Sequence, residues 1–98
     1  KKNDEKPQKQ REISNLLKAY PNLPFILIGD SGEKDGDIYQ EISNLFPGRI
    51  KAIYLRSVNH SRRMKRIENL FLDFKDIPFL MVNKTEEAIA HAKENGFI

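Results

Sequence analysis

The stretch FILIGDSGEKDGDIY, residues 25–39, indicates both the fold and the candidate site of this 98-residue chain. Its first five residues, Phe25 to Gly29, form a short and continuously apolar run, which is typical of a parallel strand buried on both faces. The run ends at Asp30, and acids, glycines and a serine follow before the next apolar position. A buried strand that ends on a carboxylate predicts a ligand site, because open α/β sheets bind ligands at the carboxyl ends of their strands.

Helical and strand patterns alternate along the rest of the chain. We expect helices over 8–20, 35–46, 61–72 and 86–95, and strands over 25–29, 49–56 and 77–82. Pro21 and Pro24 end the first helix, while Thr85 is the expected N-cap of the last helix and Gly96 its stop. The order α-β-α-β-α-β-α predicts an α/β domain with parallel strands and right-handed crossovers.

Three parallel strands make a thin sheet, since doubly wound sheets usually have more. We expect completion either by chain before Lys1, in which case this is the C-terminal half of a larger doubly wound domain, or by a second copy. Residues 1–8 are polar, contain a proline and are interpreted as a disordered or linker N-terminus. Residues 9–98 are interpreted as the partial domain.

The composition, with 39% hydrophobic and 32% charged residues, is ordinary for a globular protein. The absence of cysteine excludes disulfides, zinc–thiolate sites and a cysteine nucleophile. No apolar run approaches the ~20 residues that a membrane span needs, and a cytoplasmic location is the default expectation. The net charge of +3 arises from residues 1–11, which hold five cations and two anions.

The loop after residue 29 carries the candidate chemistry. Asp35 lies five residues after Asp30, at the expected helix start, and can fold back toward it. Two carboxylates at a strand end suit Mg²⁺, which takes oxygen ligands from one or two protein groups and the rest from water and phosphate. Gly29 and Gly32 would let the backbone turn and a ligand approach, and the amides of Ser31, Gly32 and Glu33 would bind a phosphate oxygen. A plain turn with a helix cap fits the same residues.

The stretch from Arg56 to Arg66 is strongly basic. Arg56 closes the second strand on the ligand side of the sheet, so it is a candidate for binding a substrate phosphate. The remaining cations fit a solvated helix face, or a surface that meets anionic lipid headgroups. Nucleic acid is not the expected partner, because no exposed aromatic residues interleave with the basic ones. We assign no role to His60 or His91.

Residues 23–58, LPFILIGDSGEKDGDIYQEISNLFPGRIKAIYLRSV, resemble the final motif region of the phosphatidate phosphatase family associated with actin patches. That family belongs to the haloacid dehalogenase superfamily. The resemblance implies a three-layer, Rossmann-like (HAD-like) parallel sheet in which Asp30 and Asp35 hold Mg²⁺. It also implies an active-site lysine, which matches Lys9, with Lys6 as the alternative. Gln8 stands where the family pattern leads us to expect a histidine.

The superfamily's nucleophile motif, DxDxT/V at a strand end, is absent from these 98 residues. The resemblance therefore implies the metal-binding C-terminal portion of a Mg²⁺-dependent phosphatase whose complete form works through an aspartyl-phosphate. We expect this portion alone to be inactive. The implied substrate is phosphatidate or another phosphorylated small molecule, and the implied contacts are an anionic membrane surface and the upstream part of the domain or a second copy. Two alternatives stay open: a non-catalytic α/β module that binds a cation or phosphate, and a basic nucleic-acid-binding domain.

Overall fold

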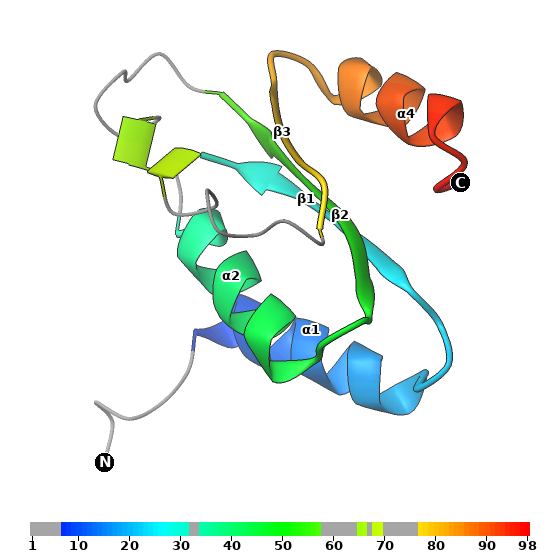
Figure 1. Ribbon diagram of the computed structural model, residues 1–98. Coiled ribbons are helices and arrows are strands. Elements are labelled where there is room, and N and C mark those ends of the chain that lie inside the picture. Colours follow the sequence, from blue (N-terminus) through cyan, green and yellow to red (C-terminus); the bar gives the residue numbers. More distant parts are fainter. Residues whose placement is uncertain (1–6, 32–33, 58–64, 67, 70–76) are drawn as a thin grey trace.

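The structure is a computed structural model that describes residues 7–31, 34–57, 65–66, 68–69 and 77–98. Its elements follow in the order α1 (Gln8–Ala19), β1 (Phe25–Asp30), α2 (Asp35–Leu45), β2 (Ile50–Arg56), β3 (Phe79–Val82) and α4 (Thr85–Glu94) (Figure 1). These bounds agree with the predicted elements to within two residues at each end. Of the predicted helix over 61–72, residues 65–66 and 68–69 are described, and they are helical.

The three strands form one parallel sheet in the order β1-β2-β3. Asp30 of β1 is the register partner of Arg56 of β2, and Arg56 in turn is the partner of Val82 of β3. The carboxyl ends of all three strands therefore reach the same edge of the sheet, which we call the carboxyl edge. The predicted α/β class with parallel strands is confirmed.

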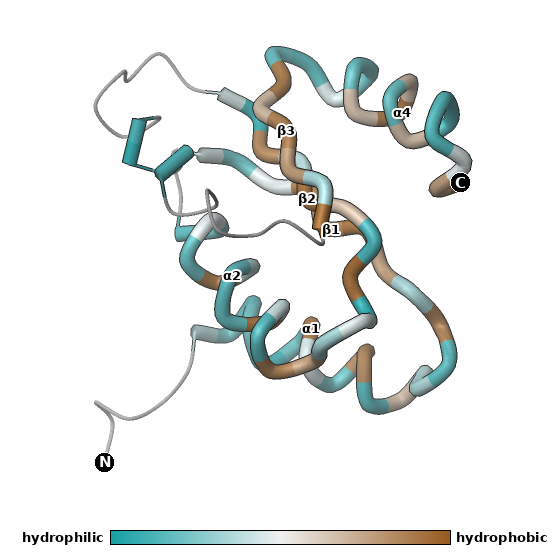
Figure 2. Tube along the Cα trace, in the orientation of Figure 1, coloured by the Kyte–Doolittle hydropathy of each residue, from teal (hydrophilic) through white to brown (hydrophobic). Residues whose placement is uncertain are grey.

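Helices cover the two faces of the sheet separately, which gives three layers (Figure 1). On one face, Leu17 of α1 and Ile42 of α2 pack with Leu27, Ile53 and other strand residues. On the opposite face, α4 contributes two alanines to a smaller cluster that also contains Ala52, Tyr54 and Val82. The tube coloured by hydropathy shows the same arrangement, with hydrophobic strands between helices that carry hydrophilic residues along their length (Figure 2). The middle strand β2 is thus buried from both sides.

Arg49 fixes the loop between α1 and β1. Its guanidinium donates hydrogen bonds to the backbone carbonyls of Leu17, Tyr20 and Leu23 and lies 5.9 Å from the centre of the Phe25 ring. A cation at this position also suits the negative end of the helix dipole. The preceding glycine, at φ +81°, makes the left-handed turn that brings the chain from α2 to this arginine.

The start of α4 corrects one prediction. Thr85 is the first helical residue, and the N-cap is Lys84. The Glu87 carboxylate accepts hydrogen bonds from the backbone N–H groups of Asn83 and Lys84, at 2.7 and 3.4 Å, so a side chain inside the helix satisfies the donors that precede it. At the other end, Gly96 at φ +73° follows the C-cap, which confirms it as the stop.

Within the described part of the chain, β1 is an edge strand and Ile28 on it is 44% exposed, so the prediction of a strand buried on both faces is wrong for the described residues. The expectation that further chain or a second copy pairs with the open side of the sheet stays a prediction. No helix among the described residues combines the length and the apolarity that crossing a bilayer demands.

Candidate active site at the carboxyl edge of the sheet

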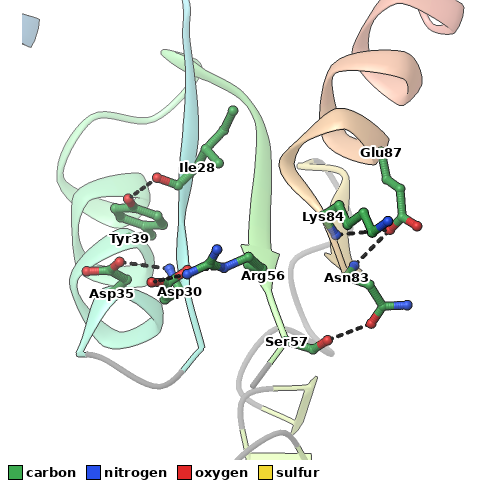
Figure 3. Close-up of polar contacts among 9 residues, drawn as sticks. All are labelled: Ile28, Asp30, Asp35, Tyr39, Arg56, Ser57, Asn83, Lys84 and Glu87. Carbon is green, nitrogen blue, oxygen red and sulfur yellow. Dashed lines mark hydrogen bonds and ion pairs between the residues drawn. The ribbon is translucent and has the colours of Figure 1, made fainter. Parts of the chain in front are cut away.

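Asp30 and Arg56 face each other across the ends of β1 and β2 (Figure 3). Arg56 Nε lies 2.9 Å from Asp30 Oδ1, and Arg56 Nη2 lies 3.1 Å from Asp30 Oδ2, so the guanidinium fork occupies both carboxylate oxygens. The parallel register produces this pair, because it places the two residues side by side at the carboxyl edge. Both side chains remain open to solvent, with 37% of the aspartate and 51% of the arginine exposed.

Asp35 lies behind this pair, at the first position of α2, and its side chain is only 5% exposed. Its Oδ2 accepts a hydrogen bond from the backbone N–H of Asp30 at 3.0 Å, and its Oδ1 lies 2.7 Å from Lys9 Nζ. The expectation that Asp35 folds back toward Asp30 is confirmed. A buried carboxylate needs such partners, since an unpaired charge would be costly there.

Gly29 provides the space in which Asp35 and Tyr39 approach the strand. A Cβ atom built on Gly29 would lie 2.3 Å from Asp35 Oδ2 and 2.7 Å from the Tyr39 hydroxyl oxygen. The expectation that Gly29 makes a sharp turn is wrong: it lies within β1 and its φ is not positive. The reason for glycine here is the close approach of two buried side chains.

The Tyr39 hydroxyl donates a hydrogen bond to the carbonyl of Ile28 at 2.8 Å (Figure 3). Burial first, and then the negative charges of Asp35 and Asp30, raise the pKa of this phenol well above its ordinary value of 10.0. The hydroxyl therefore stays protonated at neutral pH and keeps donating. Sequence reasoning assigns no role to Tyr39 and therefore misses its part in shaping the site.

The predicted phosphate-binding residues have different outcomes. The Ser31 N–H is not free, because it donates to the carbonyl of Arg56 at 2.9 Å, and the residue is fully buried. Gly32 and Glu33 lie outside the described residues, as does Lys6. Arg56 lies at the carboxyl edge, as expected. The role of each in phosphate binding stays a prediction.

Two further polar residues lie along the same edge and were not predicted. Ser57 follows β2 and Asn83 follows β3, and the serine hydroxyl donates to Asn83 Oδ1 at 2.9 Å (Figure 3). The signal that could have found them is their position, since each directly follows a strand whose carboxyl end reaches this edge.

Arg66 and His91 have contacts other than the acids Asp30 and Asp35. Arg66 pairs with Asp37 in the first turn of α2, with Nη2 3.0 Å from Oδ2, and both side chains are at least half exposed. Most of the stretch, including His60, lies outside the described residues. His91 accepts or donates a hydrogen bond with the buried Tyr54 hydroxyl at 2.7 Å, which places it in the packing of α4.

The acids at the carboxyl edge fit a Mg²⁺ site whose remaining ligands are water and phosphate. No group of three or more acidic, histidine or cysteine side chains suited to a metal ion occurs among the described residues. Mg²⁺ is nonetheless held in many proteins by one or two carboxylates together with water and phosphate. Both oxygens of each acid have partners, but those of Asp30 lie in an exposed ion pair whereas Asp35 is buried; that both acids hold Mg²⁺ stays a prediction. A shallow groove of about 360 Å³ along α1 includes neither acid.

Comparison with known proteins agrees with the resemblance of residues 23–58. The family model described as the catalytic domain of phosphatidate phosphatase APP1 matches residues 1–57. The chain is 44% identical over 54 residues to phosphatidate phosphatase APP1 of Saccharomyces cerevisiae, covering 55% of this chain and 9% of that protein. It is also 44% identical over 55 residues to an uncharacterized protein of Schizosaccharomyces pombe, covering 53% of this chain and 9% of that protein.

The chain thus matches 9% of the length of each of these relatives. No solved structure matches it. The family match nevertheless covers 57 of the 98 residues and contains both acids, the lysine and the arginine of the carboxyl edge. The chain therefore belongs to the family of the phosphatidate phosphatase APP1 catalytic domain.

Proposed function

We propose that this chain supplies the metal-binding part of the active site of a Mg²⁺-dependent phosphatase that acts on phosphatidate or a related phosphomonoester. One observation carries the proposal: a solvent-accessible carboxylate, Asp30, ends a parallel strand directly against a buried and fixed acid, Asp35. Family membership gives this arrangement a phosphatase context. The yeast relative's name, phosphatidate phosphatase, suggests the substrate class.

Each side chain has a distinct part in this proposal. Asp30 offers a carboxylate oxygen to Mg²⁺, and Asp35 fixes the Asp30 backbone and orients Lys9. Lys9 has two further N–H donors beyond the one directed at Asp35, and its half-exposed side chain can turn them toward a phosphate oxygen. Bound Mg²⁺ would neutralise negative charge on the phosphate during the reaction.

The nucleophile of the proposed reaction lies outside these 98 residues. An aspartate there would attack phosphorus, and water would then hydrolyse the aspartyl-phosphate, with the Rossmann-like, HAD-like domain completed by that chain. We propose a cytoplasmic protein that meets its substrate on an anionic membrane. The basic stretch ending at Arg66 would attract such a surface.

The test is Mg²⁺-dependent phosphate release from phosphatidate by the natural full-length protein. We compare wild type, Asp30→Asn and the matched control Asp37→Asn, whose acid also pairs with an exposed arginine but does not end a strand. Asp30→Asn should lose activity by at least ~100-fold, the scale set by loss of a single charge-stabilising group, with an unchanged circular dichroism spectrum. Equal activity in wild type and Asp30→Asn would contradict the proposal. Binding of Mg²⁺ and phosphate without activity in any variant would favour the non-catalytic module.

A further inference from the structure

We propose that Asp30 and Arg56 exchange partners when ligands bind. The dianionic phosphate of a phosphomonoester takes the Arg56 guanidinium, and this frees the Asp30 carboxylate for a divalent cation. The inference rests on the proposed function and adds to it that the cation and the anion bind cooperatively. The ion pair between Asp30 and Arg56 is then the ligand-free state of the site.

Arg56 occupies both carboxylate oxygens of Asp30. Two N–H groups of Arg56 are directed at the two oxygens of Asp30, at 2.9 and 3.1 Å. A cation that approaches either oxygen therefore meets a guanidinium that is already bound there. It also meets the positive charge of that guanidinium at contact distance, which opposes a second cation.

The two acids, Asp35 and Asp30, differ in how firmly they are held. Asp35 is held by the Asp30 amide and by Lys9 in surroundings that leave 5% of its side chain exposed. Asp30 has its side-chain partner in an exposed ion pair, and exposed pairs contribute little to stability. One carboxylate is thus fixed in position, while the other is held by an interaction that a competing ligand can replace.

The Arg56 guanidinium can bind a phosphate in place of the Asp30 carboxylate. Its planar fork of donors matches a phosphate as well as a carboxylate, and a phosphomonoester dianion brings two negative charges where Asp30 brings one. Once a phosphate holds Arg56, both the steric and the electrostatic obstacle to a cation at Asp30 are reduced. By linkage, the cation must then favour the anion by the same factor.

The molecule offers a matched control for this pair. Asp37 and Arg66 form a second exposed aspartate–arginine contact, with distances of 3.0 and 3.4 Å. Asp37 lies in the first turn of α2, and this pair makes no recorded contact with Asp30, Asp35 or Arg56. If exposed ion pairs in general altered cation binding, removal of this pair would have the same effect as removal of the first.

The experiment measures Mg²⁺ affinity of the natural full-length protein by isothermal titration calorimetry, at known free Mg²⁺, with and without inorganic phosphate. The variants are wild type, Arg56→Gln and Arg66→Gln. A second arm, with wild type and Arg56→Gln only, replaces phosphate by phosphatidylcholine vesicles that carry a phosphonate analogue of phosphatidate, which cannot be hydrolysed. Vesicles of phosphatidylcholine alone complete that arm.

We expect phosphate to raise the Mg²⁺ affinity of wild type and of Arg66→Gln by ~5- to 150-fold, the usual range of coupling between sites. Arg56→Gln should bind Mg²⁺ more tightly than wild type without phosphate and should lose the phosphate effect. If the phosphonate vesicles raise the Mg²⁺ affinity and inorganic phosphate does not, the dianion must arrive on a lipid. If phosphonate vesicles and inorganic phosphate both raise it, free phosphate suffices. Either result supports the exchange.

The exchange is overturned if phosphate and phosphonate vesicles both leave the wild-type affinity unchanged, if Arg56→Gln keeps the full coupling, or if plain phosphatidylcholine produces it. Absence of coupling in a protein whose phosphatase activity depends on Asp30 would refute the exchange and leave the proposed function standing. Absence of any Mg²⁺ binding by wild type, with or without phosphate, would refute both.

Discussion

Replacement of Gly29 by alanine should damage the site and the fold together. The added methyl carbon would lie 2.3 Å from Asp35 Oδ2, 2.7 Å from the Tyr39 hydroxyl oxygen and 2.9 Å from Asp35 Cγ. These distances are below those of real van der Waals contacts. Both neighbouring side chains are buried, and the carboxylate is held by two partners, so neither can move away without losing a hydrogen bond.

The magnitude follows from three contributions. Overpacking of a well-packed core costs about 1–3 kcal/mol, and loss of the charge-assisted bond from the Asp30 amide costs roughly 1.5–3 kcal/mol. Alanine gains about 0.5–1 kcal/mol over glycine within a strand. Because relieving the clash is what breaks the bond, the first two contributions do not add fully. We expect Gly29→Ala to lower the free energy of unfolding by about 2–4 kcal/mol.

The assay is urea unfolding of the chain followed by circular dichroism. Gly48→Ala is the control, because its φ of +81° imposes a backbone strain of about 1–2 kcal/mol while no atom lies within 4 Å of the added carbon. In the full-length protein, Gly29→Ala should also lose phosphatase activity, and Gly48→Ala should not. A Gly29→Ala stability within about 0.5 kcal/mol of wild type, the range of a neutral surface substitution, would refute the reasoning.

Three other changes test the fold around the site. Arg49→Ala should lower the free energy of unfolding by about 2–3 kcal/mol, because its guanidinium bonds three backbone carbonyls in the last turn of α1 and the loop that follows, and Arg49→Lys should recover less than half of this in urea unfolding. Tyr39→Phe should cost about 1 kcal/mol at neutral pH through its lost hydrogen bond. Because the pKa of Tyr39 is raised in the folded state, its contribution to stability is complete below pH 10 and is lost as pH rises from there through the folded pKa. Tyr39→Phe should therefore reduce the alkaline slope of the free energy of unfolding against pH by up to ~1.4 kcal/mol per pH unit. Burial also raises the pKa of Tyr54, but this residue titrates in both proteins. Glu87→Ala should cost about 1 kcal/mol in thermal unfolding through its lost capping bonds, and Glu86→Ala should cost less.

The features that sequence predicted well depend on neighbours in the chain. The apolar run from Phe25 marks a strand by itself, and Asp30 must lie at its carboxyl end. Asp35 begins the next helix after a loop too short to carry it away, which explains why its approach to Asp30 could be foreseen. Helix ends at prolines and glycines are local in the same sense.

The features that sequence did not predict depend on register and on packing between distant elements. Arg56 meets Asp30 because β2 pairs in one particular register with a strand 26 residues earlier, and another register would separate them. The need for glycine at position 29 arises from Asp35 and Tyr39, which are close in space but belong to α2. At α4, the Glu87 carboxylate replaces the hydroxyl cap expected of Thr85, a competition between two local signals that sequence alone does not decide.

We propose that Asp30 is the acid through which this chain holds Mg²⁺. The most direct test is calorimetric titration of Mg²⁺ into the natural full-length protein in the presence of phosphate, with wild type, Asp30→Asn and Asp37→Asn compared. Loss of an outer-shell partner typically weakens metal binding ~10- to 100-fold, so loss of a direct ligand should weaken it at least as much. We expect such a loss for Asp30→Asn and wild-type affinity for Asp37→Asn. Equal Mg²⁺ affinity in all three proteins would contradict it.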